Sequence, residues 1–190
     1  PATRTMFTHT FWLRTADNNQ GGITVAFAPI GAPGTIMLME DLIACGAKSF
    51  VGVGASGSLD TRHTVGTVLI PETVKVIDEG TSKHYPAKGP PTADTKLRNE
   101  LCTLIKKHGG KTASGDWWTT DGFYREMNDD IASYTKAGII GVDMETSAMY
   151  QVAKHRNVKV CNTLVVSDEL WAEWNYGINF DEFKIGVSTM

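Results

Sequence analysis

Residues 141–150, Gly-Val-Asp-Met-Glu-Thr-Ser-Ala-Met-Tyr, decide the fold because the pattern changes within them from strand to helix. The apolar run 137–140 before them is typical of a buried strand. Behind the turn, apolar residues recur at the spacing of one helix face: Met144, Ala148 and Val152. Asp143 and Glu145 stand at the turn, where α/β sheets bind ligands, and their oxygens are suited to hydroxyl groups. The same two acids also favour a helix N-terminus, so this stretch alone leaves both interpretations open.

Outward from this stretch, short apolar runs alternate with amphipathic segments. Further strands are predicted at 7–13, 23–28, 48–53, 65–76 with an interruption at Pro71, and 158–166. Helices are predicted at 35–44, 94–108, 130–136, 144–155 and 180–187. A turn signal at 17–22 joins the first two strands into a hairpin. The alternation indicates an α/β fold with a mostly parallel sheet. No repeat or linker divides the chain, so we predict a single domain over residues 1–190.

The composition excludes several classes of function. Hydrophobic residues make up 42% and charged residues 21%, as in ordinary globular proteins. The net charge of −3 gives no attraction for polyanions, so we predict no nucleic-acid partner and no membrane partner. Three cysteines lie far apart, which favours reduced thiols and a cytoplasmic location: Cys45, Cys102 and Cys161. The five histidines lack ligand spacing, so no metal site is predicted.

Three strand ends and one loop carry groups that suit a common ligand. The segments are Gly54 to Ser58, Asp143 to Glu145, Ser167-Asp168, and the aromatic loop Phe123-Tyr124. Glu145 is suited to accept hydrogen bonds from hydroxyls, and the Phe123 ring is suited to pack against a flat heterocycle. Asp168, when protonated, is suited to donate to a leaving group. This set of residues favours a sugar joined to a heterocyclic base.

Four segments, in this order, resemble the nucleoside phosphorylase family, which includes hexameric purine nucleoside phosphorylase, uridine phosphorylase and the methylthioadenosine nucleosidases. Residues 46–57, GAKSFVGVGASG, resemble its phosphate-strand motif, and residues 119–124 resemble its base-side loop. Residues 141–150 resemble its ribose motif, and residues 166–168, Val-Ser-Asp, resemble its acid motif. Four ordered motifs spread over residues 22–170 are more specific than any one of them.

The resemblance implies a twisted, mixed and partly barrel-like central sheet flanked by helices, in a homo-oligomer that is a dimer or a trimer of dimers. It implies ribose-binding roles for Glu145 and Met144, and base-binding roles for Phe123, Ser167 and Asp168. Asp168 is also the implied catalytic acid at the purine N7, because neutralising charge on the departing base lowers the barrier. A pocket lined by Trp117 and Phe123 is expected to desolvate this acid.

The resemblance also implies inorganic phosphate as co-substrate, no cofactor, and a phosphate site at Arg4, Gly54, Ala55 and Ser56. The chain departs from the family here, because phosphorylases carry arginine at the Gly52 position and serine or threonine at Ala55. An arginine fork is the natural partner of phosphate, and glycine cannot replace it. The family's amino-terminal glycine loop and most of its last helix are expected to be missing from this sequence.

We therefore predict an enzyme that cleaves the N-glycosidic bond of a ribonucleoside by phosphorolysis, giving free base and ribose 1-phosphate. Two alternatives stay open, a hydrolytic nucleosidase that uses water and a nucleoside-binding protein without catalysis. Purines are favoured, because uridine phosphorylases carry glutamine and arginine where this chain has Met127 and Asp129. Two further interpretations concern side chains near these motifs: Trp171 and Trp174 as packing residues or a flap, and Arg125-Glu126 as solvated surface charges.

Overall fold

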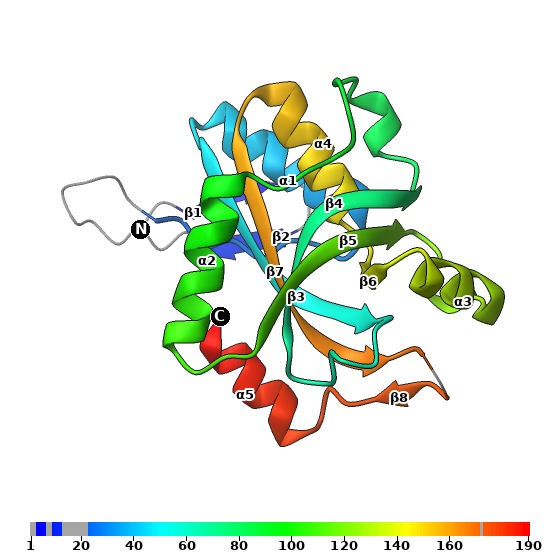
Figure 1. Ribbon diagram of the computed structural model, residues 1–190. Helices are drawn as coiled ribbons and strands as arrows, with labels where there is room; N and C mark the ends of the chain where they lie inside the picture. The colour runs from blue at the N-terminus through cyan, green and yellow to red at the C-terminus, as the bar shows by residue number, and fades with distance from the viewer. Residues whose placement is uncertain (1–2, 7–8, 13–22, 172) are drawn as a thin grey trace.

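The computed structural model describes residues 3–6, 9–12, 23–171 and 173–190. A six-stranded mixed sheet forms the centre, and helices cover it on both sides (Figure 1). Its strands are β3 (Ser49–Ser58), β4 (Val68–Asp78), β5 (Thr112–Thr120), β6 (Ile139–Asp143), β7 (Lys159–Glu169) and β8 (Asn175–Tyr176). The predicted α/β class is therefore confirmed, and the short strand β8 is an element that the sequence pattern did not indicate.

The sheet is mixed rather than mostly parallel. Strands β3 and β7 are parallel, and so are β4, β5 and β6 within their own group. The two groups meet through short antiparallel pairings, β3 with β6 and β4 with β7. Five strands thus pair in a partial ring without forming a full barrel. The carboxyl ends of β3, β5 and β7 point to the same side, on the right in Figure 1.

Strand β4 continues through Pro71, where the sequence predicted an interruption. Pro71 pairs with Gly115 of β5, and the register shifts between Pro71 and Thr73. Proline has no N–H to donate, so it is tolerated in a sheet next to such an irregularity. The sequence signal was therefore a local bulge and not the end of a strand.

Five helices surround the sheet: α1 (Ala32–Ala44), α2 (Thr95–Lys107), α3 (Asn128–Lys136), α4 (Thr146–Arg156) and α5 (Asp181–Thr189). Two short 3₁₀ helices, η1 (Ser82–His84) and η2 (Phe123–Arg125), lie in loops. Helices α1 and α4 pack together, whereas α2 and α5 contact β7 from the other side (Figure 1). Among the described residues, no helix has the length and apolar character needed to cross a membrane.

The ends of α2 and α4 carry residues that are typical of helix ends. Asp94 caps α2 by accepting a hydrogen bond from the Leu97 N–H at 2.9 Å. Asn157 closes α4 in the left-handed conformation, with φ of 55°, and Gly109 follows α2 with φ of 84°. The largest core cluster lies between the sheet and the α1–α4 pair, and includes Trp117, Tyr150, Ile36, Leu69 and Val166.

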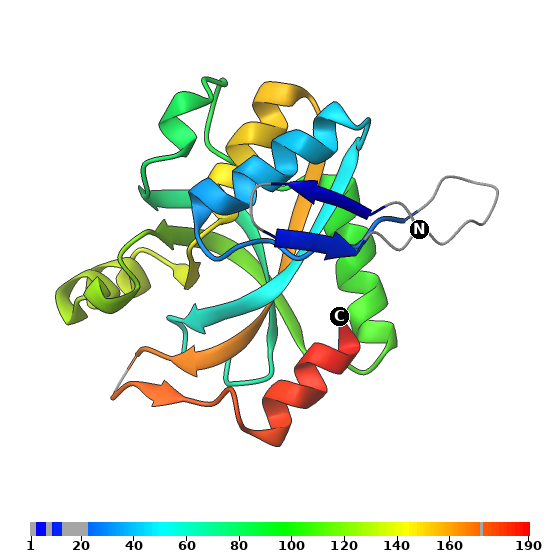
Figure 2. The ribbon, with the colours of Figure 1, turned by 180° about the vertical axis from the view of Figure 1, so that it is seen from behind.

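The amino-terminal hairpin differs from the prediction. Strands β1 (Thr3–Met6) and β2 (His9–Trp12) pair with each other and lie across one side of the sheet (Figure 2). The predicted turn at 17–22 lies outside the described residues. The predicted strand at 23–28 is wrong, because residues 24–28 form no strand and Ile23, Val25 and Phe27 are exposed. An alternating pattern makes a strand only where a sheet edge supplies hydrogen bonds.

Candidate functional site

Asp143 ends β6 and holds the start of helix α4. Its Oδ1 accepts hydrogen bonds from Trp117 Nε1 at 3.0 Å and from Thr119 Oγ1 at 2.9 Å. Its Oδ2 accepts from the backbone N–H and the hydroxyl of Thr146. Burial raises the pKa of Asp143, and these donors oppose the rise. With both oxygens occupied, Asp143 positions α4, so its sequence interpretation as an acid at a helix N-terminus is the correct one.

Glu145 stands at the N-cap position of α4, half-buried, with Met144 beside it. Its carboxylate accepts a 2.6 Å hydrogen bond from the N–H of Gly31, the residue before α1. Burial, and then the charge of Asp143, raises the pKa of Glu145 to about 7. The carboxyl group is therefore poised between its neutral and charged forms near neutral pH, at the point where α1 and α4 both begin.

Asn162 of β7 lies directly beside Gly52 of β3 and closes the space next to it. Its Nδ2 donates to Thr146 Oγ1 at 2.8 Å, whereas its buried Oδ1 has no hydrogen-bond partner in the described part of the chain. A Cβ atom added to Gly52 would come within 2.3 Å of that Oδ1. A side chain at position 52 is therefore excluded unless Asn162 moves, which gives a packing reason for the glycine.

Asp168 lies near the end of β7 and is 6% exposed. Ser167 Oγ lies 2.6 Å from its Oδ1, and Trp174 Nε1 donates to its Oδ2 at 3.0 Å. The Ser167 hydroxyl also lies 3.2 Å from the Ser56 carbonyl oxygen, which connects the acid to β3. Asp168 pairs with Tyr176 of β8, so it lies within a strand pairing.

The loop 121–126 joins the two ends of the site. At its start, Asp121 lies close enough to Glu145 for its charge to raise the pKa of that carboxyl. At its end, the charge of Asp168 contributes to raising the pKa of Glu126 to about 7, after the larger effect of burial. Phe123 lies between these two points, 43% exposed, with Tyr124 edge-on at 5.1 Å. Charge effects therefore connect the start of this loop with Glu145 and its end with Asp168, and Phe123 lies between the two positions in the chain.

Glu126 is the residue that sequence reasoning missed. It was interpreted as a solvated surface charge, but it is half-buried, and burial, followed by the charge of Asp168, raises its pKa to about 7. No sequence pattern marks this, because Asp168 is distant in the chain and reaches Glu126 only through the course of the loop. Two carboxyl groups at close range disfavour simultaneous ionisation, which keeps one of them protonated to higher pH.

The residues expected to bind phosphate are less clearly arranged. Gly54 and Ala55 are exposed on β3, while Ser56 is buried with an unpartnered hydroxyl. Arg4 lies on β1, opposite Phe11, and its side chain lies outside what the structure describes. Trp117 is a further position at which the structure contradicts the prediction.

Trp117 does not line a pocket with Phe123. It is 0% exposed in the core, where its ring packs against Gly141 and its Nε1 binds Asp143. The second half of β5, residues 117–120, is buried throughout, so the Trp117 side chain lies in the core. Desolvation by this residue therefore acts on Asp143 and not on Asp168.

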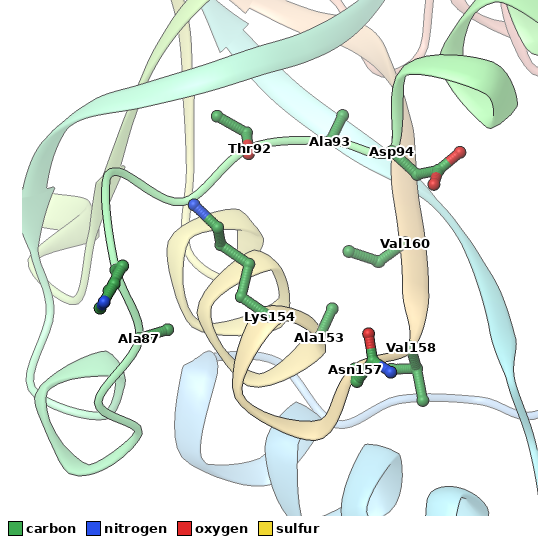
Figure 3. Close-up of a pocket in the computed structure, with 10 residues that line it drawn as sticks. Ala87, Thr92, Ala93, Asp94, Ala153, Lys154, Asn157, Val158 and Val160 are labelled. Atoms are coloured by element: carbon green, nitrogen blue, oxygen red, sulfur yellow. The ribbon is translucent and has the colours of Figure 1, made fainter.

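A surface pocket of about 390 Å³ lies at the opposite end of α4 (Figure 3). The loop from Ala87 to Asp94 forms one wall, and the end of α4 with the start of β7 forms the other. Lys154 reaches across to the Pro90 carbonyl oxygen at 2.6 Å. The pocket contains none of the residues predicted to bind ligand, so it is distinct from the candidate site that includes Glu145 and Asp168. Among the described residues, no group of histidine, cysteine, aspartate or glutamate is arranged to hold a metal ion.

Comparisons with known proteins identify the family of the chain. The model of the phosphorylase superfamily matches residues 1–185. A guanosine phosphorylase of Halorubrum lacusprofundi is 24% identical over 161 residues, and a DeoD-type purine nucleoside phosphorylase of Roseobacter denitrificans is 27% identical over 150. These alignments cover 84% and 78% of this chain, which spans only 66% and 64% of those relatives. The crystal structure of purine nucleoside phosphorylase from Toxoplasma gondii with immucillin-H superimposes with a TM-score of 0.84 at 25% identity. It covers 97% of this chain and 76% of that one.

Proposed function

This chain belongs to the phosphorylase superfamily, and we propose that it cleaves the N-glycosidic bond of a purine ribonucleoside by phosphorolysis. The products are the free base and ribose 1-phosphate. The observation that carries the proposal is the loop 121–126. The charge of Asp121 at its start acts on Glu145, the proposed carboxyl for the sugar, and the charge of Asp168, the proposed acid for the base, acts on Glu126 at its end. Relatives named as purine and guanosine phosphorylases support the choice of a purine.

The ribose end of the proposed site is built on Glu145 and Met144. In the ligand-free protein the Glu145 carboxylate is held by the Gly31 N–H at 2.6 Å, so a carboxylate oriented by the backbone is already in place. The two hydroxyls of a ribose donate to its oxygens, and the half-buried Met144 packs against the sugar ring. A preoriented acceptor loses little side-chain entropy on binding, which favours tight positioning of the sugar.

The base end is built on Phe123, Ser167 and Asp168. As the C1′–N9 bond breaks, its electron pair moves to the purine, and the proton of Asp168 passes to N7. A phosphate oxygen forms the new bond to C1′, and Asp168 is left ionised. The carboxylate is then stabilised by its existing contacts with Ser167 and Trp174. Neutralising the leaving base where charge develops lowers the barrier.

For the phosphate, we propose Arg4, Gly54, Ala55 and Ser56 as ligands. Support comes from Ser56, whose buried hydroxyl has no partner within the described residues and is free to donate to an anion. The phosphate is a co-substrate, and no cofactor enters the proposed reaction.

Hydrolysis is a second candidate, favoured by one specific observation. Asn162 fills the space beside Gly52, so the position that carries a phosphate-binding arginine in phosphorylases cannot hold a side chain here. Water needs no cationic fork, and attack by water on C1′ would yield free ribose in place of ribose 1-phosphate. The same Glu145 and Asp168 serve both reactions, so the choice rests on the acceptor alone.

One assay separates these cases. The protein is incubated with inosine, adenosine or uridine, with and without inorganic phosphate, and free base is measured. Purine release that requires phosphate supports phosphorolysis, and equal release without phosphate supports hydrolysis. If saturating nucleoside raises the melting temperature and no base is formed, the protein is a binder and the enzymatic proposal is wrong. Faster cleavage of uridine than of both purine nucleosides would overturn the base assignment.

We further propose a cytoplasmic location and assembly as a homo-oligomer, either a dimer or a trimer of dimers. Support for assembly comes from large apolar side chains exposed near the start of α1: Ile23, Val25, Phe27, Ile30 and Met37. Exposed apolar groups of this kind mark interaction surfaces in soluble proteins. Light scattering coupled to size-exclusion chromatography tests the assembly, and a monomer at all concentrations would contradict it.

A further inference from the structure

Trp174 combines a buried contact with an exposed ring. It lies between β7 and β8, and its Nε1 donates to Asp168 Oδ2 at 3.0 Å. The residue is nevertheless 62% exposed, so most of the indole surface is open to solvent. An indole buried for packing alone would hide its apolar surface and not only its N–H. In Trp174 the N–H is hydrogen-bonded, whereas the apolar surface of the ring is exposed to solvent.

The fold of this segment does not depend on Trp174. Strand β8 pairs with β7 through Asn175 and Tyr176, and the Gly177 N–H donates to the Ser167 carbonyl oxygen at 2.7 Å. The Asn175 side chain adds a further hydrogen bond to Glu169 at 3.1 Å. The chain after Asp168 is therefore already attached to β7 by backbone and side-chain bonds. The hydrogen bond from the indole to Asp168 is therefore not needed to hold this segment against β7.

We propose that Trp174 is a positioning residue for Asp168 and that the open face of its indole binds the purine base. This inference rests on the proposed function, since it assigns a second aromatic contact to the same base site. The sequence alone left Trp174 open as either a packing residue or a flap. Its exposure excludes core packing, and its bond to Asp168 places the ring next to the proposed acid.

The positioning role follows from the two oxygens of Asp168. Ser167 contacts Oδ1 and Trp174 donates to Oδ2, so the ionised carboxylate has a partner on each side. Donors of this kind favour the ionised form and therefore make the protonated acid a better proton donor. When Asp168 gives its proton to N7 and the C1′–N9 electron pair leaves with the base, Trp174 stabilises the carboxylate that remains. The indole itself exchanges no proton.

The binding role follows from the aromatic surface around the same point. The Tyr176 ring lies 5.5 Å from that of Trp174, inclined by 45°, and is itself 47% exposed. Together they form a small aromatic patch next to an acid, which matches a purine that presents a flat face and an N7 acceptor. Stacking of a base on an aromatic side chain is sequence-tolerant and strengthens with the size of the ring system.

Two variants separate the roles. W174F keeps a ring but removes the N–H, so we expect kcat to fall about tenfold, at the lower end for a contact that assists a general acid, with KM changed less than about twofold. W174A removes the ring as well, and KM should then rise about tenfold, the usual effect of losing one stacking contact. W171F, the same substitution at the neighbouring tryptophan, is the matched control and should retain wild-type kinetics.

The pH–rate profile and fluorescence supply readouts that a structural role would not change. In W174F the carboxylate of Asp168 loses a hydrogen-bond donor, so the profile should differ from that of the wild type. Because the pKa of Glu126 is about 7 and Glu126 interacts with Asp168, the two profiles are also compared in an E126Q background. Free hypoxanthine should quench the fluorescence of the wild-type protein, with the quench lost in W174F and kept in W171F.

The kinetic measurements test the positioning role, and the fluorescence measurements test the base contact. A W174F variant with the wild-type profile and wild-type kcat would overturn the positioning role, and an unchanged quench in W174F would overturn the base contact. Melting temperatures within about 2 °C of wild type, less than the shift that 1 kcal/mol produces, confirm that the variants are folded. The hypoxanthine titration needs no turnover, so failure of the enzymatic proposal would remain distinguishable from failure of this one.

Discussion

The two ends of the proposed site are built in opposite ways. The sugar end rests on the start of α4, where Asp143 is buried and accepts hydrogen bonds from Trp117, Thr119 and Thr146. The base end rests on loops, where Phe123 and Trp174 are 43% and 62% exposed around a single buried acid. The sugar end is therefore fixed by the same packing that stabilises the protein. The base end can vary with little effect on stability, which suits a family whose members differ in the base they accept.

The comparison predicts that the largest effect on activity comes from the two carboxyl groups. Asp168→Asn should slow purine nucleoside cleavage by about 10²–10⁴-fold, the usual contribution of a positioned acid, with little change in stability. Glu145→Ala should abolish ribose binding, because no second acceptor replaces its carboxylate. Steady-state kinetics and ligand-induced thermal shift measure both. Full activity in Glu145→Ala would show that the sugar end has been placed wrongly.

The next largest effect should be on stability and should appear only at the sugar end. Asp143→Ala leaves the buried donors of Trp117, Thr119 and Thr146 without an acceptor, at about 1–3 kcal/mol for each unsatisfied group. Urea denaturation should show a large loss in the free energy of unfolding. Asp129→Asn on the exposed surface of α3 is the control and should stay near wild type. Equal stability of the two variants would mean that the sugar end of the proposed site is not fixed by the packing around Asp143.

Gly52 gives a sharper test of the same packing. Gly52→Ala should destabilise the protein by about 1–3 kcal/mol, as overpacked cores do, because its Cβ meets Asn162. Asn162→Ala opens that space, so the double variant should be less destabilised than the two single effects combined. A double-mutant cycle in urea measures the coupling. Simple additivity would show that Asn162 is not what requires glycine at position 52.

The smallest effect concerns pH and belongs to the base end. Burial raises the pKa of Glu126 from 4.5 to about 7, so between these values the folded protein binds more protons than the unfolded chain. Stability from this group is thus fully present below pH 4.5 and is lost as pH rises through about 7. Glu126→Gln should weaken this decline in melting temperature across that range. Glu145 titrates over the same range, so the decline should not vanish. An unchanged slope would show that Glu126 is solvated, as its sequence first suggested.

Local patterns predicted the regular elements well because they reflect neighbouring residues. The helix predicted at 94–108 and the strand–turn–helix predicted over 137–155 both appear close to where they were expected. Predictions failed where the outcome depended on a distant partner. Residues 24–28 alternate as a strand does but form none, and Pro71 sits at a bulge inside β4. Trp117, expected near the acid, is buried against Asp143 instead.

The sequence by itself determined the α/β class, the family motifs and the identity of the carboxyl groups at the strand ends, since each depends on residue type and short-range spacing. Only the tertiary structure decided which groups meet. Gly31 reaches Glu145 across 114 residues, and Trp174 turns back onto Asp168 across a strand reversal. Contacts of this kind depend on how the sheet curves and the loops close. Hydrophobic periodicity in the sequence cannot encode these contacts. It specifies which face of a helix or strand is buried, and not which residues pack against that face.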